Sequence, residues 1–89
     1  MTEYWLYILR CNDGSYYTGK TSNLEKRINE HNFGTYKGYT FSRRPVKLVY
    51  CQKFYCVKEA IEAERKIKGW SRKKKEALIN DNYKLLHNL

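Results

Sequence analysis

Two short runs rich in aromatic and branched side chains flank one turn signal, and they constrain the fold more than any other feature. The first run covers 4–11, Asn12-Asp13-Gly14 follows, and the second run covers 15–21. Such residues favour strands, and an Asp-Gly pair between two of these runs is typical of a β-hairpin. Because the chain has only 89 residues, it holds one hydrophobic core. We therefore expect one domain over 1–82, built on a hairpin, and a tail over 83–89.

The rest of the sequence predicts a third strand and three helices. The strand is expected over 46–54, and the helices over 24–32, 57–69 and 72–80. Asn23 and Ser71 are candidate N-caps, Gly69 is a candidate C-cap, and 33–45 is expected to be a long loop. The order β-β-α-β-α-α indicates an α/β domain of the α+β kind. Its small three-stranded, mostly antiparallel sheet is flanked by helices.

The register of the hairpin decides which tyrosines share a face of the sheet. A two-residue Asp13-Gly14 turn would place Tyr7 and Tyr17 on opposite faces. A three-residue loop with Gly14 left-handed would pair Tyr7 with Gly19 and put both tyrosines on one face. Periodicity and turn chemistry do not choose between the two registers.

Two charged residues occupy helix positions where an apolar face is expected. Arg27 lies on the apolar stripe of the first helix, and Glu64 falls within the stripe of the second. An unpaired charge is costly to bury, so each of these residues needs a partner or a task. Two interpretations stay open. The pair forms a structural Arg27–Glu64 salt bridge, or both charges serve a functional site.

The chain is strongly basic, with 18 Lys and Arg residues, 9 Asp and Glu residues and a net charge of +9. Its cations concentrate in 65–75, which holds no acid, and in 20–47, where tyrosines are interleaved with them. Aromatic faces stack bases while cations hold phosphates. This pattern favours nucleic acid as the partner over a merely solvated basic face.

Hydropathy and cysteine usage indicate where the protein works. No stretch approaches the ~18 apolar residues of a membrane-spanning helix, and no signal-peptide-like run is present. The three cysteines are an odd number without a closely spaced pair, which favours free thiols in a reducing compartment. We therefore expect a cytoplasmic protein that does not bind membranes.

An ordered set of residues resembles the GIY-YIG endonuclease superfamily, over nearly the whole chain. The set comprises Trp5-Leu6-Tyr7, Tyr17-Thr18-Gly19, Lys20, Asn23-Leu24, Arg27, His31 and, just before Ile67-Lys68, Glu64. Its details resemble the short, single-domain bacterial branch of that superfamily. Trp5 replaces the glycine of the first name-giving tripeptide, and Thr18 replaces the isoleucine of the second. The resemblance favours the three-residue hairpin loop.

The resemblance implies a metal-dependent endonuclease, and we expect it to hydrolyse phosphodiester bonds in DNA. The residues alone do not choose between DNA and RNA. Glu64 would hold one Mg²⁺ or Mn²⁺ ion, and Arg27 would brace the phosphoryl oxygens. Tyr7 would orient or deprotonate the attacking water, with a phenol pKa lowered by nearby cations. Tyr17 would hold a phosphate or share that role, and His31 would relay a proton.

Basic residues around this site are expected to bind the nucleic acid. They are Lys20, Arg43, Arg44, Lys68, Arg72, Lys73, Lys74 and Lys75. Gly19 is expected to leave space opposite the Tyr7 ring. The alternative function is a basic, non-catalytic nucleic-acid-binding domain on the same fold.

Overall fold

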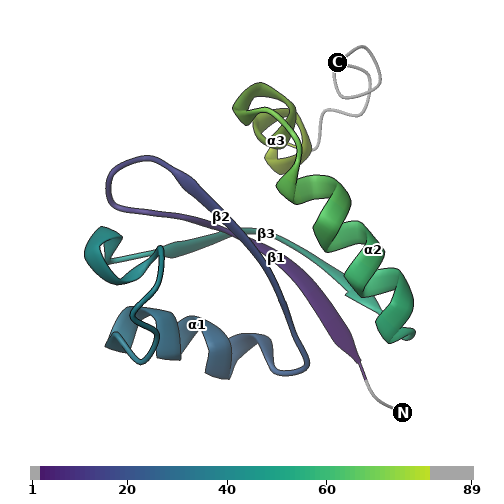
Figure 1. Ribbon diagram of the computed structural model, residues 1–89, viewed down its shortest axis with the longest axis horizontal. Helices are drawn as coiled ribbons and strands as arrows, with labels where there is room; N and C mark the ends of the chain where they lie inside the picture. Colours follow the sequence, from purple (N-terminus) through teal and green to yellow (C-terminus); the bar gives the residue numbers. More distant parts are fainter. Residues whose placement is uncertain (1–2, 81–89) are drawn as a thin grey trace.

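The computed structural model describes residues 3–80, and its elements follow the predicted order (Figure 1). They are β1 (Tyr4–Arg10), β2 (Tyr16–Thr21), α1 (Leu24–Phe33), a short 3₁₀ helix (Phe41–Arg43), β3 (Lys47–Phe54), α2 (Val57–Lys68) and α3 (Arg72–Ile79). Every predicted strand and helix boundary is confirmed to within one residue. The predicted tail at 83–89 and the domain boundary before it lie outside the described residues.

The strands form one antiparallel sheet in the order β2-β1-β3, and the hairpin has the register of the three-residue loop. Tyr7 lies opposite Gly19, so Tyr7 and Tyr17 project from the same face. Gly14 in the loop has a left-handed φ of 85°, a conformation that glycine adopts without steric cost. The register favoured by the family resemblance is therefore confirmed.

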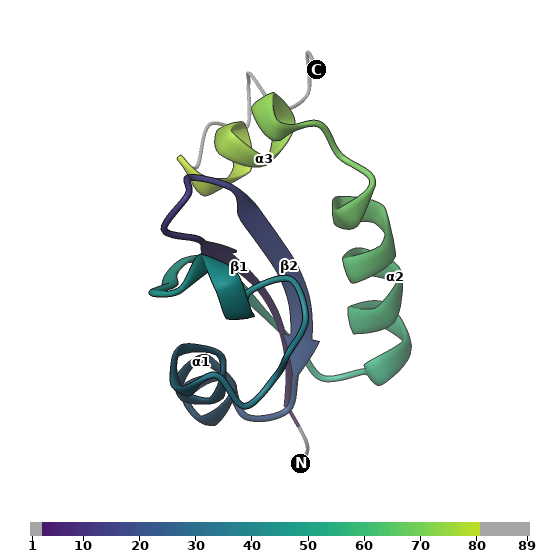
Figure 2. The same ribbon diagram turned by 60° about the vertical axis from the view of Figure 1, so that its left-hand side comes forward.

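Helices cover both faces of the sheet, with α1 on one side and α2 and α3 on the other (Figure 2). The central strand β1 is buried on both faces, which explains its nearly continuous apolar sequence. Leu6 and Ile8 pack toward α2 and α3, whereas Tyr7 and Leu9 pack on the α1 side. All four of these side chains are fully buried. The two sides of β1 thus belong to two separate hydrophobic clusters.

Local capping explains where the helices begin. The Asn23 side chain accepts the Lys26 N–H at 3.1 Å at the start of α1, and Ser71 caps α3 in the same way. Gly69 follows α2 at the predicted C-cap position. None of the helices within residues 3–80 is long and apolar enough to cross a membrane. The three cysteines are free thiols, as predicted.

The loop between α1 and β3, residues 34–46, is tied to the hairpin turn rather than hanging free. The Asn12 N–H donates to the Arg43 carbonyl at 2.8 Å, and Arg43 Nε donates to Asp13 Oδ2 at 3.0 Å. At the other end, the Asn32 side chain exchanges two hydrogen bonds with the Val46 backbone. This anchoring holds the middle of the loop against the α1 side of the sheet.

Candidate active site

A buried hydrogen-bonded chain of side chains joins β1, α1 and loop 34–46. Tyr7 Oη lies 3.0 Å from His31 Nε2, and His31 Nδ1 lies 2.8 Å from Thr40 Oγ1. The residues are 0%, 3% and 2% exposed, respectively. Buried polar groups require hydrogen-bond partners, and these three satisfy one another. A neutral imidazole has one donor and one acceptor nitrogen, so the histidine tautomer sets the direction of the chain.

Gly19 provides the space that the Tyr7 side chain needs. A Cβ atom at Gly19 would lie 2.5 Å from Tyr7 Oη, far inside ordinary contact distance. The Gly19 backbone is not left-handed, so glycine is required here for space rather than for conformation. The predicted space opposite Tyr7 therefore exists, and the phenol itself fills it.

Burial raises the pKa of Tyr7 to about 12. Tyr17 adds to the rise, the positive charge of Arg27 opposes it, and Glu64 contributes the weakest increase. Arg27 lowers this pKa as predicted, through its charge and a side-chain hydrogen bond. The predicted net direction is nevertheless wrong, because desolvation of the buried phenol outweighs the effect of this guanidinium. In the free protein Tyr7 is a neutral phenol at neutral pH.

His31 is also neutral at that pH. Burial lowers its pKa, the nearby Arg27 charge lowers it further, and Glu30 acts weakly in the opposite direction. A neutral His31 accepts a hydrogen bond through one ring nitrogen only. When Nδ1 carries the proton and donates to Thr40, Nε2 accepts the hydrogen bond of Tyr7.

Aromatic rings extend this chain toward the surface. Tyr17 lies 5.2 Å from His31 and 6.0 Å from Tyr39, measured between ring centroids, and it stacks on Tyr39. Tyr36 lies 5.3 Å from His31 on the other side. The outer rings, Tyr36 and Tyr39, are 37% and 43% exposed, so the row opens to solvent at both ends.

A guanidinium lies over each outer ring of this row. Arg27 Cζ is 5.2 Å from the Tyr36 centroid, and Arg43 Cζ is 3.9 Å from the Tyr39 centroid. Sequence reasoning noticed these tyrosines only as part of a basic stretch, and it missed Thr40. Alternating Tyr and Lys or Arg was the available signal for the rings, whereas no local pattern marks Thr40.

Arg27 and Glu64 do not pair with each other. Arg27 Nε is 3.6 Å from Glu30 Oε1, and it is buried without a hydrogen bond in the described part of the chain. Glu64 Oε2 is 3.9 Å from Lys68 Nζ, which exceeds hydrogen-bond distance. The structural Arg27–Glu64 salt bridge is therefore contradicted. Both charges keep unused hydrogen-bonding capacity.

Glu64 approaches the site from the opposite side of the sheet to Tyr7, Tyr17, Arg27 and His31. It lies on α2, which packs along the edge strand β2 and the central strand β1. Its field nevertheless reaches Tyr7, whose pKa it raises. The predicted catalytic residues thus surround the β2 edge, four from the α1 side and one from the α2 side.

Glu64 has the chemistry of a one-carboxylate magnesium site. Its side chain is 15% exposed and accepts no hydrogen bond from residues 3–80. Mg²⁺ is commonly bound through one or two carboxylates, with water and substrate oxygens as the other ligands. No cluster of three or more His, Cys, Asp or Glu residues occurs in the described structure. The residues therefore fit a metal ion whose other ligands are water and substrate oxygens. They do not fit a metal site in which the protein supplies all the ligands.

The arginines predicted to bind nucleic acid are partly engaged within the fold. Arg43 is paired with Asp13, and Arg44 Nε donates to the Phe41 carbonyl at 2.8 Å. Arg72 Nη1 donates to the Gly14 carbonyl at 2.7 Å and its Nε pairs with Glu76. These side chains hold the hairpin turn, loop 34–46 and α3 in place.

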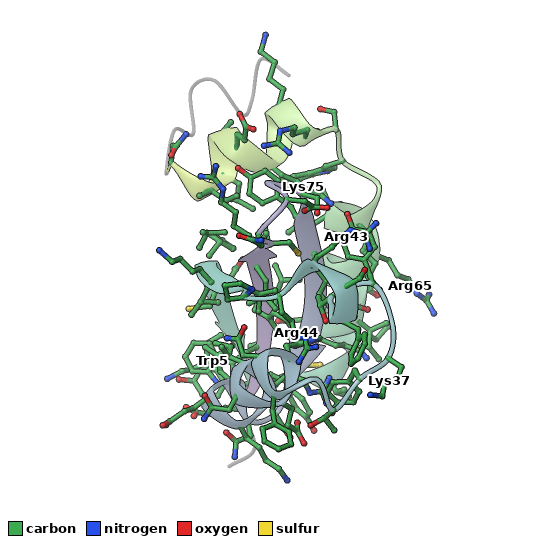
Figure 3. All side chains as sticks on the ribbon, turned by 90° about the vertical axis from the view of Figure 1, so that its left-hand side faces the viewer. Trp5, Lys37, Arg43, Arg44, Arg65 and Lys75 are labelled. Atoms are coloured by element: carbon green, nitrogen blue, oxygen red, sulfur yellow. The ribbon has the colours of Figure 1, made fainter. Side chains whose placement is uncertain are left out.

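The predicted lysines lie on three different elements of the fold. Lys20 is on β2, Lys68 ends α2, and Lys73, Lys74 and Lys75 lie in α3. Lys74 Nζ lies 4.6 Å from the Trp70 ring centroid. In Figure 3, Lys75 is labelled near α3, Arg43 near the middle of the molecule and Lys37 toward the α1 end. Basic side chains therefore extend beyond the candidate site in both directions.

Comparison with known proteins identifies the family of the chain. The GIY-YIG catalytic domain family matches residues 3–77. A UPF0213 protein of Staphylococcus saprophyticus is 47% identical over 81 residues, which span 91% of this chain and 99% of that protein. A UPF0213 protein of Syntrophus aciditrophicus is 46% identical over 83 residues, which span 92% and 95% of the two chains.

Two solution NMR structures share the fold. The UPF0213 protein BH0048 of Bacillus halodurans has a TM-score of 0.60 and 40% identity, over 90% of this chain and 85% of that one. The protein EF2693 of E. faecalis has a TM-score of 0.65 and 39% identity, over 93% and 88%. The chain therefore belongs to the GIY-YIG family, a family of nucleases that act on nucleic acid.

Proposed function

We propose that this protein is a metal-dependent endonuclease that hydrolyses phosphodiester bonds in DNA. The observation that carries the proposal is the buried Tyr7–His31–Thr40 chain on the α1 side of the sheet. Burying three polar side chains is costly, and a domain that only binds nucleic acid through its surface has no use for them. A proton-transfer site does need titratable groups that are aligned and shielded from water.

The chain suggests how a water molecule becomes a nucleophile. Tyr7 Oη takes a proton from the attacking water while the phenol proton passes to His31 Nε2. Thr40 Oγ1 accepts the hydrogen bond of His31 Nδ1–H, which selects the tautomer able to receive that proton. The water oxygen then forms a bond to phosphorus while a strand P–O bond breaks. The departing oxygen keeps the electron pair of that bond and takes a proton from solvent. In this scheme Tyr7 relays the proton, and the high pKa of its free phenol is no obstacle.

Arg27 and Tyr17 would hold the phosphate during this step. The buried Arg27 Nε has no hydrogen-bond partner in residues 3–80, so it has a donor to offer a phosphoryl oxygen. Charge-assisted hydrogen bonds of this kind stabilise the negative charge that develops in the transition state. Tyr17, whose ring contacts His31, lies at the surface side of the chain and would orient the same group.

Glu64 would hold Mg²⁺ or Mn²⁺ at the other side of the β2 edge. When bound, the ion would neutralise charge on the phosphoryl oxygens. The free Cys11, Cys51 and Cys56 thiols support a reducing, cytoplasmic location for this activity. The second candidate function, nucleic-acid binding without turnover, rests on the basic surface alone, with its net charge of +9.

A cleavage assay on labelled DNA and RNA of several shapes, with Mg²⁺, Mn²⁺ or EDTA, tests the proposal. Wild-type protein should cleave DNA only with metal, and Tyr7→Phe should lower the rate by about 10²–10⁴-fold. Lys58→Gln, at an exposed position of α2, is the control and should cleave as the wild type does. Repeated pure preparations that bind DNA but never cleave it would establish the binding-only alternative.

A further inference from the structure

A separate pocket lies beside Tyr17, at the open edge of β2. It has a volume of about 260 Å³ and is lined by Tyr16, Tyr17, Thr18, Tyr39, Lys68 and Lys75. These residues come from β2, loop 34–46, α2 and α3. Because one water molecule takes up only ~30 Å³, the pocket has room for a partly hydrated tetrahedral anion. We call it the Lys68–Lys75 pocket.

The charged groups that line this pocket are both cations. Lys75 has no acidic partner in the described part of the chain, and the contact of Lys68 Nζ with Glu64 is 3.9 Å long. Burial lowers the pKa of Lys75, and the charge of Lys68 lowers it further. Two like charges that face each other in a partly desolvated space repel, and a bound anion would relieve that repulsion.

Thr18 adds uncharged donors to the same wall. It is 3% exposed, and its buried Oγ1 has no hydrogen-bond partner among the described residues. The hydrogen bonds of an antiparallel edge strand alternate between facing the neighbouring strand and facing outward. The Cys11 N–H donates to the Ser15 carbonyl, so the backbone groups of Ser15 point toward β1. By the same alternation the backbone groups of Tyr17 point toward β1, and the Thr18 N–H points toward the open edge. The pocket lies at that edge.

We propose that the Lys68–Lys75 pocket binds a second phosphate of the nucleic-acid strand, next to the phosphate held at Tyr17 and Arg27. Tyr17 lines the pocket and also contacts His31, so one strand crossing Tyr17 would reach both places. The identity of the strand rests on the proposed function, whereas anion binding in the pocket does not.

The second phosphate would position the first. Gripping one strand at two consecutive phosphates fixes its direction and its register, and reactions gain much of their rate from such positioning. The stacked Tyr17 and Tyr39 rings form the wall on the active-site side of the pocket. The pocket therefore distinguishes a polynucleotide from a lone phosphate ester, which would occupy one of the two places.

The test measures the affinity of short probes for the Glu64→Gln variant, which is expected not to cleave them. The measurements are made without metal. NMR titration with inorganic phosphate should shift the amides of Tyr17, Thr18 and Lys75. The trinucleotide TpTpT, with two phosphodiesters, should bind at least tenfold more tightly than TpT, with one. When Lys68→Gln and Lys75→Gln are added to this variant, TpTpT should bind less than twofold more tightly than TpT, because the second phosphate loses its contacts.

Controls separate the pocket from general charge. Lys47→Gln with Lys58→Gln removes the same charge from exposed positions and should keep the tenfold gain. Lys68→Arg with Lys75→Arg keeps the charges and should restore it, and thermal melts show that each variant is folded. If TpTpT keeps its tenfold advantage over TpT in the variant with Lys68→Gln and Lys75→Gln, the proposal is overturned.

Two further outcomes also overturn the proposal. A gain confined to probes with a terminal phosphomonoester, such as pTpT, would make the pocket a reader of strand ends. Phosphate shifts without any gain from a second phosphate would leave an isolated anion site. Because these measurements need no cleavage, a protein that passes them yet never cuts DNA would refute the proposed function and keep the pocket.

Discussion

Replacing Thr40 by valine should remove the last hydrogen bond of the Tyr7–His31–Thr40 chain while nearly preserving the shape of the side chain. The substitution removes the hydroxyl that lies 2.8 Å from His31 Nδ1 and leaves that nitrogen buried without a partner. An unsatisfied buried group costs about 1–3 kcal/mol of unfolding free energy. Each kcal/mol lowers the Tm of a domain of this size by roughly 4–8 °C. Thr35→Val makes the same chemical change at an exposed position of the same loop and should alter unfolding by less than about 0.5 kcal/mol.

The same change should also disturb catalysis, in a way that lost stability alone does not. Without Thr40 the imidazole loses its preference for the Nδ1–H tautomer, so ring nitrogen NMR shifts of His31 should move toward a tautomer mixture. DNA cleavage at a temperature where the variant is fully folded should fall on the order of tenfold to a hundredfold, below the 10²–10⁴-fold of a lost general base. Thr40→Ser should restore both signals. Unchanged tautomers and unchanged cleavage, with only a lower Tm, would refute the positioning role.

Three further predictions test the site from other directions. Gly19→Ala should destabilise the domain by about 1–3 kcal/mol in urea unfolding, because its Cβ would lie 2.5 Å from Tyr7 Oη, whereas Gly38→Ala, with open space around it, should not. The burial-lowered pKa of His31 means that the unfolded state binds more protons, so stability should fall as pH drops below the unfolded pKa of about 6.5. His31→Asn should flatten that dependence over pH 5–7 in urea titrations. Glu64→Gln should abolish cleavage with level or tighter DNA binding, and Arg27→Ala should abolish it with weaker binding. Large Tm losses in both variants would instead make these charges structural.

Local chemistry explains why so much of the fold was predictable. The Asn12-Asp13-Gly14 turn, the Asn23 and Ser71 caps and the Gly69 C-cap each act within a few residues of themselves. The hairpin register was the exception, since turn chemistry allowed two pairings and the family resemblance favoured the observed one. Where the structure follows from neighbours in sequence, boundaries come out within one residue.

The site was less predictable because burial and long-range contacts decide its chemistry. The sequence displays the cations near Tyr7 but not the desolvation of its phenol, so the predicted direction of its pKa was wrong. Thr40 lies beside His31 in a loop that long-range contacts hold in place, such as the one between Arg43 and Asp13, 30 positions apart in sequence. A count of basic residues likewise cannot show which arginines the fold uses internally.

Arg27 and Glu64 each interrupt the apolar stripe of their own helix, and they do so without pairing with each other. A buried Arg27–Glu64 pair would have satisfied both groups, and the structure instead leaves Arg27 Nε without a hydrogen bond and Glu64 with one distant cation. Thr18, on the strand between them, has an unpaired buried hydroxyl as well. Local conflicts of this kind lower stability, and in natural proteins they concentrate where function requires them. The proposed binding of a phosphate and a cation at this sheet edge would give all three groups their missing partners, whereas selection for stability alone would favour replacing them.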